Sequence, residues 1–178
     1  MGYFNKINRI VALAASLTLC GVCLAQSARH QEALEKMTVR IDSIVQRAAV
    51  PLDLSDPSSP ARITSSQIFF DPDDMTEIQK YGPRAVPVLA KFLLNRNARI
   101  ERVAIRLLGA IGGPAIADPL VEVLDKSSNS GSRTEALLNL KQAPCSKAVA
   151  RAIIRAAKSD PDPLVRRQAQ EESRSCSM

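Results

Sequence analysis

Apolar and polar residues alternate along most of this 178-residue chain at the spacing of amphipathic helices. The pattern predicts helices over residues 27–48, 74–80, 85–94, 98–111, 114–125, 131–141, 146–158 and 163–173. Four of these helices follow an Asn or Asp that can accept a hydrogen bond from the first turn, at Asp73, Asn97, Asn129 and Asp162. Gly and Pro separate several of the segments, so we expect an all-α chain.

The second half of the chain repeats itself. Residues 97–104, 129–136 and 162–169 share one layout, in which Asn or Asp is followed seven positions later by Ala. These alanines, at positions 104, 136 and 169, are 32 and 33 residues apart. Periods of this length are typical of stacked helix pairs. The sequence therefore predicts a short right-handed α-solenoid of antiparallel helix pairs, with an N-terminal capping helix.

Three segments carry a family resemblance: Ala-Val-Pro-Val-Leu at 85–89, Arg-Leu-Leu-Gly-Ala-Ile-Gly at 106–112, and Asp-Pro-Asp-Pro-Leu-Val-Arg-Arg-Gln-Ala at 160–169. They resemble HEAT repeats, and more narrowly the short bacterial HEAT-like units found in phycobilin lyases. The resemblance implies a protein-binding surface, because these repeats mostly bind proteins and only occasionally do chemistry. Their Val-Arg pair is intact at 165–166, partial at 132–133 as Ser-Arg, and lost at 100–101, where the chain has Ile-Glu.

The chain divides into four expected segments. Residues 1–25 have the layout of a signal peptide: Lys6 and Arg9 precede an apolar run that ends at Leu24, and small residues precede a cleavage point after Ala25. We expect a capping helix over 26–49, a Pro- and Ser-rich linker over 50–71, and the HEAT-like domain over 72–178. The expected location is periplasmic or extracellular. A retained N-terminal membrane anchor is the alternative.

The cysteine spacing predicts a disulfide. Cys145 and Cys176 are the two cysteines that remain after cleavage, and cysteines of exported proteins tend to pair. The last two predicted helices run antiparallel around a turn near Asp160, which lies 15 residues after Cys145 and 16 before Cys176. Both cysteines therefore fall at the same end of that helix pair, where a bridge would join the last helix to the stack.

The composition argues against several kinds of chemistry. His30 is the only histidine, so the chain offers no Ser-His-acid or Cys-His set and too few ligands for zinc. Aromatic residues make up 3% of the chain and Trp is absent. The net charge of +6 falls to +4 once Lys6 and Arg9 are removed. We expect no enzyme, cofactor, metal or nucleic-acid partner, and contact with a membrane only through the signal peptide.

One charge pattern indicates a partner. Cationic residues recur along one face of the helix at 146–158, and the second helix of each pair is expected to line the inner curve of the stack. The candidate surface on these helices comprises Lys91, Glu122, Lys147, Arg151 and Arg155. Such a surface would dock an acidic protein. An ordinary solvated helix face explains the same pattern, and Arg99, Arg102 and Arg106 form a second cationic row.

These observations favour a non-enzymatic interaction or adaptor module of the periplasm or cell envelope. Two other functions stay open. One is a HEAT-like lyase or small-ligand-binding protein. The other is a structural subunit of an envelope complex, held by the apolar stripe between Leu34 and Ala48.

Overall fold

The computed structural model describes residues 3–50, 68 and 70–176, with side chains described from residue 26 onward. It divides into two units, Met1–Val39 and Arg40–Met178. The described residues of the first unit are helical and belong to α1 (Tyr3–Ala49), so the expected capping helix is part of a longer helix. Most of the expected linker, residues 51–67 and 69, lies outside the described residues. Among those that are described, no helix is long and apolar enough to cross a membrane.

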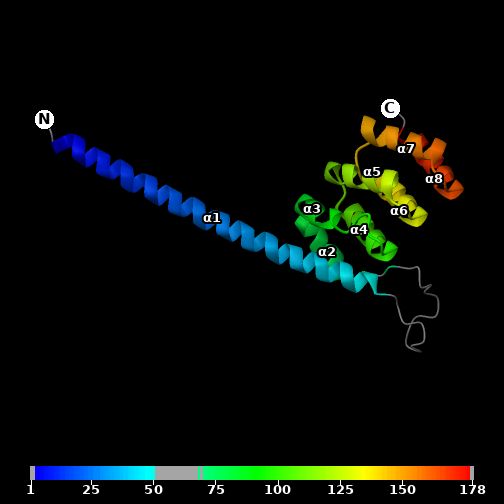
Figure 1. Ribbon diagram of the computed structural model, residues 1–178, viewed down its shortest axis with the longest axis horizontal. Helices are drawn as coiled ribbons and strands as arrows, with labels where there is room; N and C mark the ends of the chain where they lie inside the picture. Colours follow the sequence, from blue (N-terminus) through cyan, green and yellow to red (C-terminus); the bar gives the residue numbers. More distant parts are fainter. Residues whose placement is uncertain (1–2, 51–67, 69, 177–178) are drawn as a thin grey trace. The chain divides into compact units, whose positions relative to one another are not determined.

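The second unit holds two layers of helices (Figure 1). One layer contains α2 (Pro72–Tyr81), α4 (Ala98–Ile111), α6 (Ser130–Leu140) and α8 (Pro163–Ser175), and the other contains α3 (Val86–Ala90), α5 (Ala117–Lys126) and α7 (Lys147–Ser159). Neighbours pack along each layer and across to the other layer, as in α4–α6, α5–α7 and α5–α6. The described residues form no strand. The arrangement confirms the predicted all-α solenoid.

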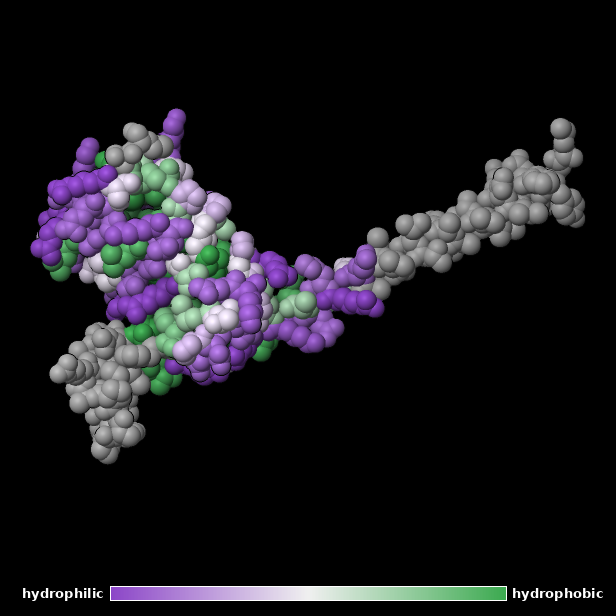
Figure 2. Space-filling model, turned by 180° about the vertical axis from the view of Figure 1, so that it is seen from behind, coloured by the Kyte–Doolittle hydropathy of each residue, from purple (hydrophilic) through white to green (hydrophobic). Residues whose placement is uncertain are grey.

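The repeated alanines mark the centre of this stack. Ala104, Ala136 and Ala169 have no exposed surface. Fully buried leucines and isoleucines surround these positions and fill the space between the layers, among them Leu107, Leu108, Ile116, Leu120 and Leu137. Hydrophilic residues cover most of the face of the stack that is visible in Figure 2, with smaller hydrophobic areas between them. The burial of apolar side chains therefore holds the helix pairs together.

The predicted helix starts are confirmed at three places and wrong at one. The side chains of Asn97, Asn129 and Asp162 each accept a hydrogen bond from a backbone N–H of the following first turn, at 2.7–3.0 Å. The exception is α2, which begins at Pro72 with Asp71 as its cap rather than Asp73. Pro is favourable at the first helical position because its missing N–H has no partner there anyway.

Helix α3 is shorter than the apolar pattern predicts. It ends at Ala90, and residues 91–94 form turns instead of continuing the helix. Leu94 has a φ of 54°, in the left-handed region that residues with a side chain rarely adopt. Its backbone N–H donates to Glu101 Oε1 at 3.1 Å. The turn that follows α3 therefore ends in one strained residue, Leu94, which Glu101 of the next repeat holds.

The last turns of α1 join the stack through ion pairs as well as apolar packing. Ile41 and Ile44 have no exposed surface. Arg47 donates to both carboxylate oxygens of Asp74 at 2.7 and 2.9 Å, and Arg40 Nε donates to Glu77 at 2.7 Å. Residues 40–49 therefore cover the first helix of the repeat region.

Tyr81 completes this cluster by donating to the other oxygen of Glu77 at 2.6 Å. Partial burial and the neighbouring carboxylate raise the pKa of Tyr81 to about 12, since both disfavour a phenolate. The hydrogen bonds from Tyr81 and Arg40 lower the pKa of Glu77. The contact between α1 and α2 therefore favours an ionised Glu77 and a neutral Tyr81.

Polar side chains also connect successive repeats at one recurring position. Glu101 of α4 is 1% exposed and accepts from Leu94 N–H before its helix and from Ser127 Oγ, at 3.0 Å, after the pair. Arg133 of α6 is 6% exposed and donates to the Ser127 carbonyl oxygen at 2.9 Å. It also donates to both oxygens of Asp160 at 2.8 Å. Each side chain thus links the loop before its helix to the loop one repeat later.

Candidate functional site

Helix α7 carries most of the candidate cations, and its position follows from its apolar face. Val149, Ala152, Ile153 and Ala156 are buried, and α7 packs against α5 and α8. Ser146 caps the helix by accepting from Val149 N–H at 3.2 Å. The opposite face of α7 therefore points to solvent.

That outward face is cationic with one apolar residue in it. Lys147, Arg151, Ile154 and Lys158, which we name the α7 face, follow each other at spacings of 4, 3 and 4 and are all exposed. The helix contains no Asp or Glu. Among the described residues, no ion pair involves the three cations of the α7 face. Their one hydrogen bond runs from Arg151 Nε to the Lys147 carbonyl oxygen. Their charges are therefore available to a partner.

One of these cations sits where a helix disfavours positive charge. Lys147 is the first residue of α7, and Arg151 is one turn later. The N-terminus of a helix carries a partial positive charge, so a cation there costs about 0.3–1 kcal/mol relative to an anion. An anionic group held between the two side chains would relieve it.

The other predicted surface residues are partly neutralised within the chain. Arg155 holds the carboxylate of Asp125 with both oxygens engaged, at 2.6–3.1 Å. This contact raises the pKa of Arg155. Glu122 accepts from Lys126 at 2.8 Å, which raises the pKa of that lysine. Arg155 and Glu122 therefore offer less charge to a partner than the sequence pattern predicts.

Lys91 is exposed just beyond the end of α3 and lies in the same layer as α5 and α7. The structure thus brings Lys147, Arg151 and Lys158 together on one helix, while Lys91 belongs to another repeat.

The second cationic row, on α4, is occupied. Arg106 holds Glu135 of α6 at 2.8 and 3.3 Å, and Arg102 lies 3.8 Å from the same carboxylate. Arg106 also donates to the carbonyl oxygen of the buried Ile68, at 3.4 Å. Arg99 donates to the Val50 carbonyl oxygen at 3.3 Å. This row therefore connects α4 to α6 and to both ends of the linker, and it is not a docking surface.

The structure joins Cys145 and Cys176 in a disulfide, the pairing that the sequence predicts, with their Cα atoms 5.6 Å apart. The bridge closes a separation of 31 residues and ties the end of α8 to the residue before the cap of α7. In the chain-entropy view, a closed loop of this length contributes about 3–4 kcal/mol to stability.

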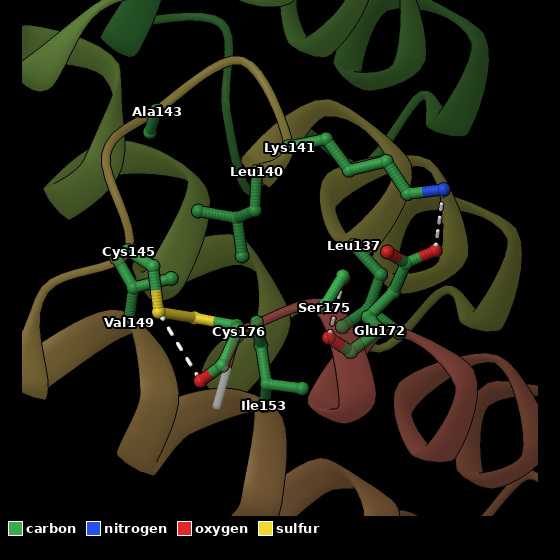
Figure 3. Close-up of a pocket in the computed structure, with 10 residues that line it drawn as sticks. All are labelled: Leu137, Leu140, Lys141, Ala143, Cys145, Val149, Ile153, Glu172, Ser175 and Cys176. Atoms are coloured by element: carbon green, nitrogen blue, oxygen red, sulfur yellow. Dashed lines mark hydrogen bonds and ion pairs between the residues drawn. A yellow bond between two sulfur atoms is a disulfide. The ribbon is translucent and has the colours of Figure 1, made fainter. Parts of the chain in front are cut away.

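Beside the disulfide lies a cavity of about 290 Å³ that the sequence did not predict (Figure 3). Aliphatic side chains from α6 and α7 line it, and the disulfide and Ser175 lie at its edge. Glu172 of α8 supplies its charged wall, where it pairs with Lys141 at 2.9 Å. Within the described part of the chain, no three His, Cys, Asp or Glu side chains are placed to hold a metal ion.

Comparison with known families agrees with this packing. Residues 102–126, which span most of α4 and α5, match the family described as PBS lyase HEAT-like repeat. No curated protein and no solved structure shows a significant match to the chain. The matched helix pair recurs before and after this segment as α2–α3, α6–α7 and the start of a further repeat at α8. The family match and the recurring helix pairs support a HEAT-like repeat protein.

Proposed function

We propose that this protein is a non-enzymatic interaction module that docks an acidic protein on the α7 face. One observation carries the proposal: three exposed cations of one helix surround Ile154 and have no acidic neighbour on that helix. Two exposed cations near this face, Lys126 and Arg155, are by contrast paired with carboxylates. The α7 face is thus a local excess of positive charge on one helix.

The residue types fit a protein partner. Ile154 is 45% exposed and gives the surface an apolar centre with a charged rim, the usual anatomy of a protein interface. Charged rims steer association and set specificity. Surfaces that bind single-stranded nucleic acid rely on stacking aromatic residues as well as cations, and α7 contains no aromatic residue. An acidic helix or loop with one apolar anchor matches these features best.

The test is capture of a partner by the full chain, compared between two charge-reversed variants. Lys147→Glu with Arg151→Glu reverses two charges of the α7 face. The control, Lys80→Glu with Arg84→Glu, makes the same change of net charge at exposed sites in the first repeat. We expect an acidic protein to be captured by the wild type and by the control, and to be lost from the α7 variant.

A stability measurement separates lost binding from misfolding. Because Lys147 opposes the helix dipole, Lys147→Glu should raise the free energy of unfolding by about 0.3–1 kcal/mol. A variant that is more stable and binds less can only have lost a contact to its partner. Equal capture by all three proteins would contradict the proposal.

We also propose that the protein works in an oxidising compartment, after export. The support is the Cys145–Cys176 bridge, since disulfides persist outside the reducing cytosol. The charged and apolar layout of residues 1–25 agrees with export. Fractionation of cells that express a C-terminally tagged chain tests this proposal. The expected product lies outside the cytosol, starts at Gln26 and has no free thiol. A full-length chain in the cytosol with two free thiols would contradict it.

A further inference from the structure

The cavity beside the disulfide has an apolar floor. Leu137, Leu140, Val149 and Ile153, which line it, are 0–3% exposed. Since each water occupies about 30 Å³ in the liquid, a volume of 290 Å³ has room for about ten non-hydrogen atoms of a ligand. This is the lower end of the size range of small-molecule sites. The lining favours an aliphatic body.

The polar wall of the cavity has one open acceptor. The Glu172 side chain is 4% exposed. Lys141 Nζ and Gln168 Nε2 both contact its Oε1, at 2.9 and 2.7 Å. Within the described residues, Oε2 accepts no hydrogen bond, and Figure 3 shows this oxygen turned to the side that Leu137 lines. Because Oε2 is not a fully buried unpaired atom, it can be reached from the cavity, and a ligand that donates to it gains a hydrogen bond to a charged acceptor.

We infer that this cavity binds a small aliphatic molecule whose head group donates a hydrogen bond to Glu172 Oε2. The aliphatic part packs on the floor formed by α6 and α7. An alcohol or an alkylammonium satisfies the free oxygen. A carboxylate of the same length cannot donate to it and brings a second negative charge beside Glu172. The site is separate from the α7 face, and the inference does not depend on the proposed docking function.

Three probes with one hydrocarbon chain test the head-group preference: 1-hexanol, hexylammonium and hexanoate. Their six-carbon chains fit within the available volume. Binding to the full, oxidised chain is measured by isothermal titration calorimetry and by ligand-observed NMR. We expect 1-hexanol and hexylammonium to bind, and hexanoate to bind about tenfold more weakly because it loses a hydrogen bond to a charged acceptor. Tighter binding of hexanoate, equal binding of all three, or no binding would overturn the inference.

Two variants locate the binding. Ala143→Leu fills the cavity from the 141–146 loop and should abolish binding of all three probes, while the exposed Ala115→Leu in the second repeat is its matched control. Glu172→Met keeps the length of the side chain but removes the acceptor, so the preference among the three head groups should disappear. Binding that survives Ala143→Leu would place the probes elsewhere and overturn the inference, even if Glu172→Met fails to fold.

Discussion

Helices α4 and α6 occupy equivalent places in successive repeats, yet they carry opposite charges at the same buried position. Glu101 in α4 accepts hydrogen bonds from the loop before its helix and from the loop one repeat later. Arg133 in α6, 32 residues on, donates to the two corresponding loops. The position therefore needs a long polar side chain that spans two loops, and either charge serves if the loops supply the matching groups.

The comparison explains an irregularity in the repeats. The Val-Arg pair at 165–166 becomes Ile-Glu at 100–101, which by sequence is a loss of the motif. In the structure the loop partner changes too, because Ser127 stands where the next repeat has Asp160. Arg166 keeps the contact to its own loop, donating to the Asp160 carbonyl oxygen at 2.6 Å. Glu101 accepts hydrogen bonds where Arg133 donates them, and both side chains connect the loops of successive repeats.

The largest expected effect comes from breaking the charged version of this contact. Arg133→Met keeps the aliphatic length but leaves the Asp160 carboxylate, 4% exposed, without its guanidinium. Removing one partner of a buried pair costs about 3–5 kcal/mol. Chemical denaturation of the full chain should show this loss. A loss below about 1 kcal/mol, as for a surface ion pair, would contradict a structural role for the contact.

A pH series supplies the control for Arg133→Met. Burial alone would raise the pKa of Asp160, but hydrogen bonds from Arg133 and from the Asp162 N–H bring it below its usual value. The ionised carboxylate is therefore favoured in the folded state. Its stabilisation is complete above the unfolded pKa of about 4 and is lost as the pH falls through the lower folded value. The wild type should lose this increment in acid, whereas Arg133→Met should lack it.

A smaller effect is expected from exchanging the charges at the α4 position. Glu101→Arg alone places a buried cation opposite Ser127 and should cost about 3 kcal/mol. Adding Ser127→Asp recreates the pair of the next repeat and should recover about 1–3 kcal/mol as coupling between the two sites. The double-mutant cycle is measured by denaturation, with Ser127→Asp alone as its fourth corner. Additive effects would mean that the two positions are not interchangeable.

The smallest effect concerns the loop that Glu101 holds. Leu94 adopts a left-handed conformation that costs a side-chain-bearing residue about 1–2 kcal/mol, and its side chain is 41% exposed. Leu94→Gly should therefore stabilise the protein by about 0.5–1 kcal/mol, which is what remains after the greater unfolded-state entropy of Gly and the loss of some apolar contact. Leu138→Gly is the comparison, at a similar exposure but inside α6 with helical geometry, and it should destabilise. Destabilisation by both would show that the conformation at Leu94 carries no strain.

Features that depend on nearby residues were predictable from the sequence. The caps at Asn97, Asn129 and Asp162, the buried alanines and the two layers follow from local spacing and a period of one helix pair. The disulfide was predictable because both cysteines lie at similar distances from one turn. The cap at Asp71 was missed because three acidic residues near Pro72 compete for that role, and Asp74 instead faces Arg47.

Features that depend on side chains from separate helices were not predictable. Asp125 and Arg155 are 30 residues apart, and only the packing of α5 on α7 shows that they neutralise each other. The cavity combines residues of α6, α7 and α8, and its single signal in the sequence was the cysteine pair at its edge. By sequence, Glu172 belongs to a polar helix and is expected at the surface. The packing of α8 buries its side chain, which is 4% exposed.

We propose that the unpaired cations of α7 bind an acidic protein. The most direct measurement is the affinity of the captured partner for the full chain by titration calorimetry, at low and high salt, with wild type and with Lys147→Glu plus Arg151→Glu. We expect binding that weakens with added salt, because salt screens exposed charges, and that is about tenfold weaker for the variant at low salt. Affinity that changes with neither salt nor charge reversal would contradict it.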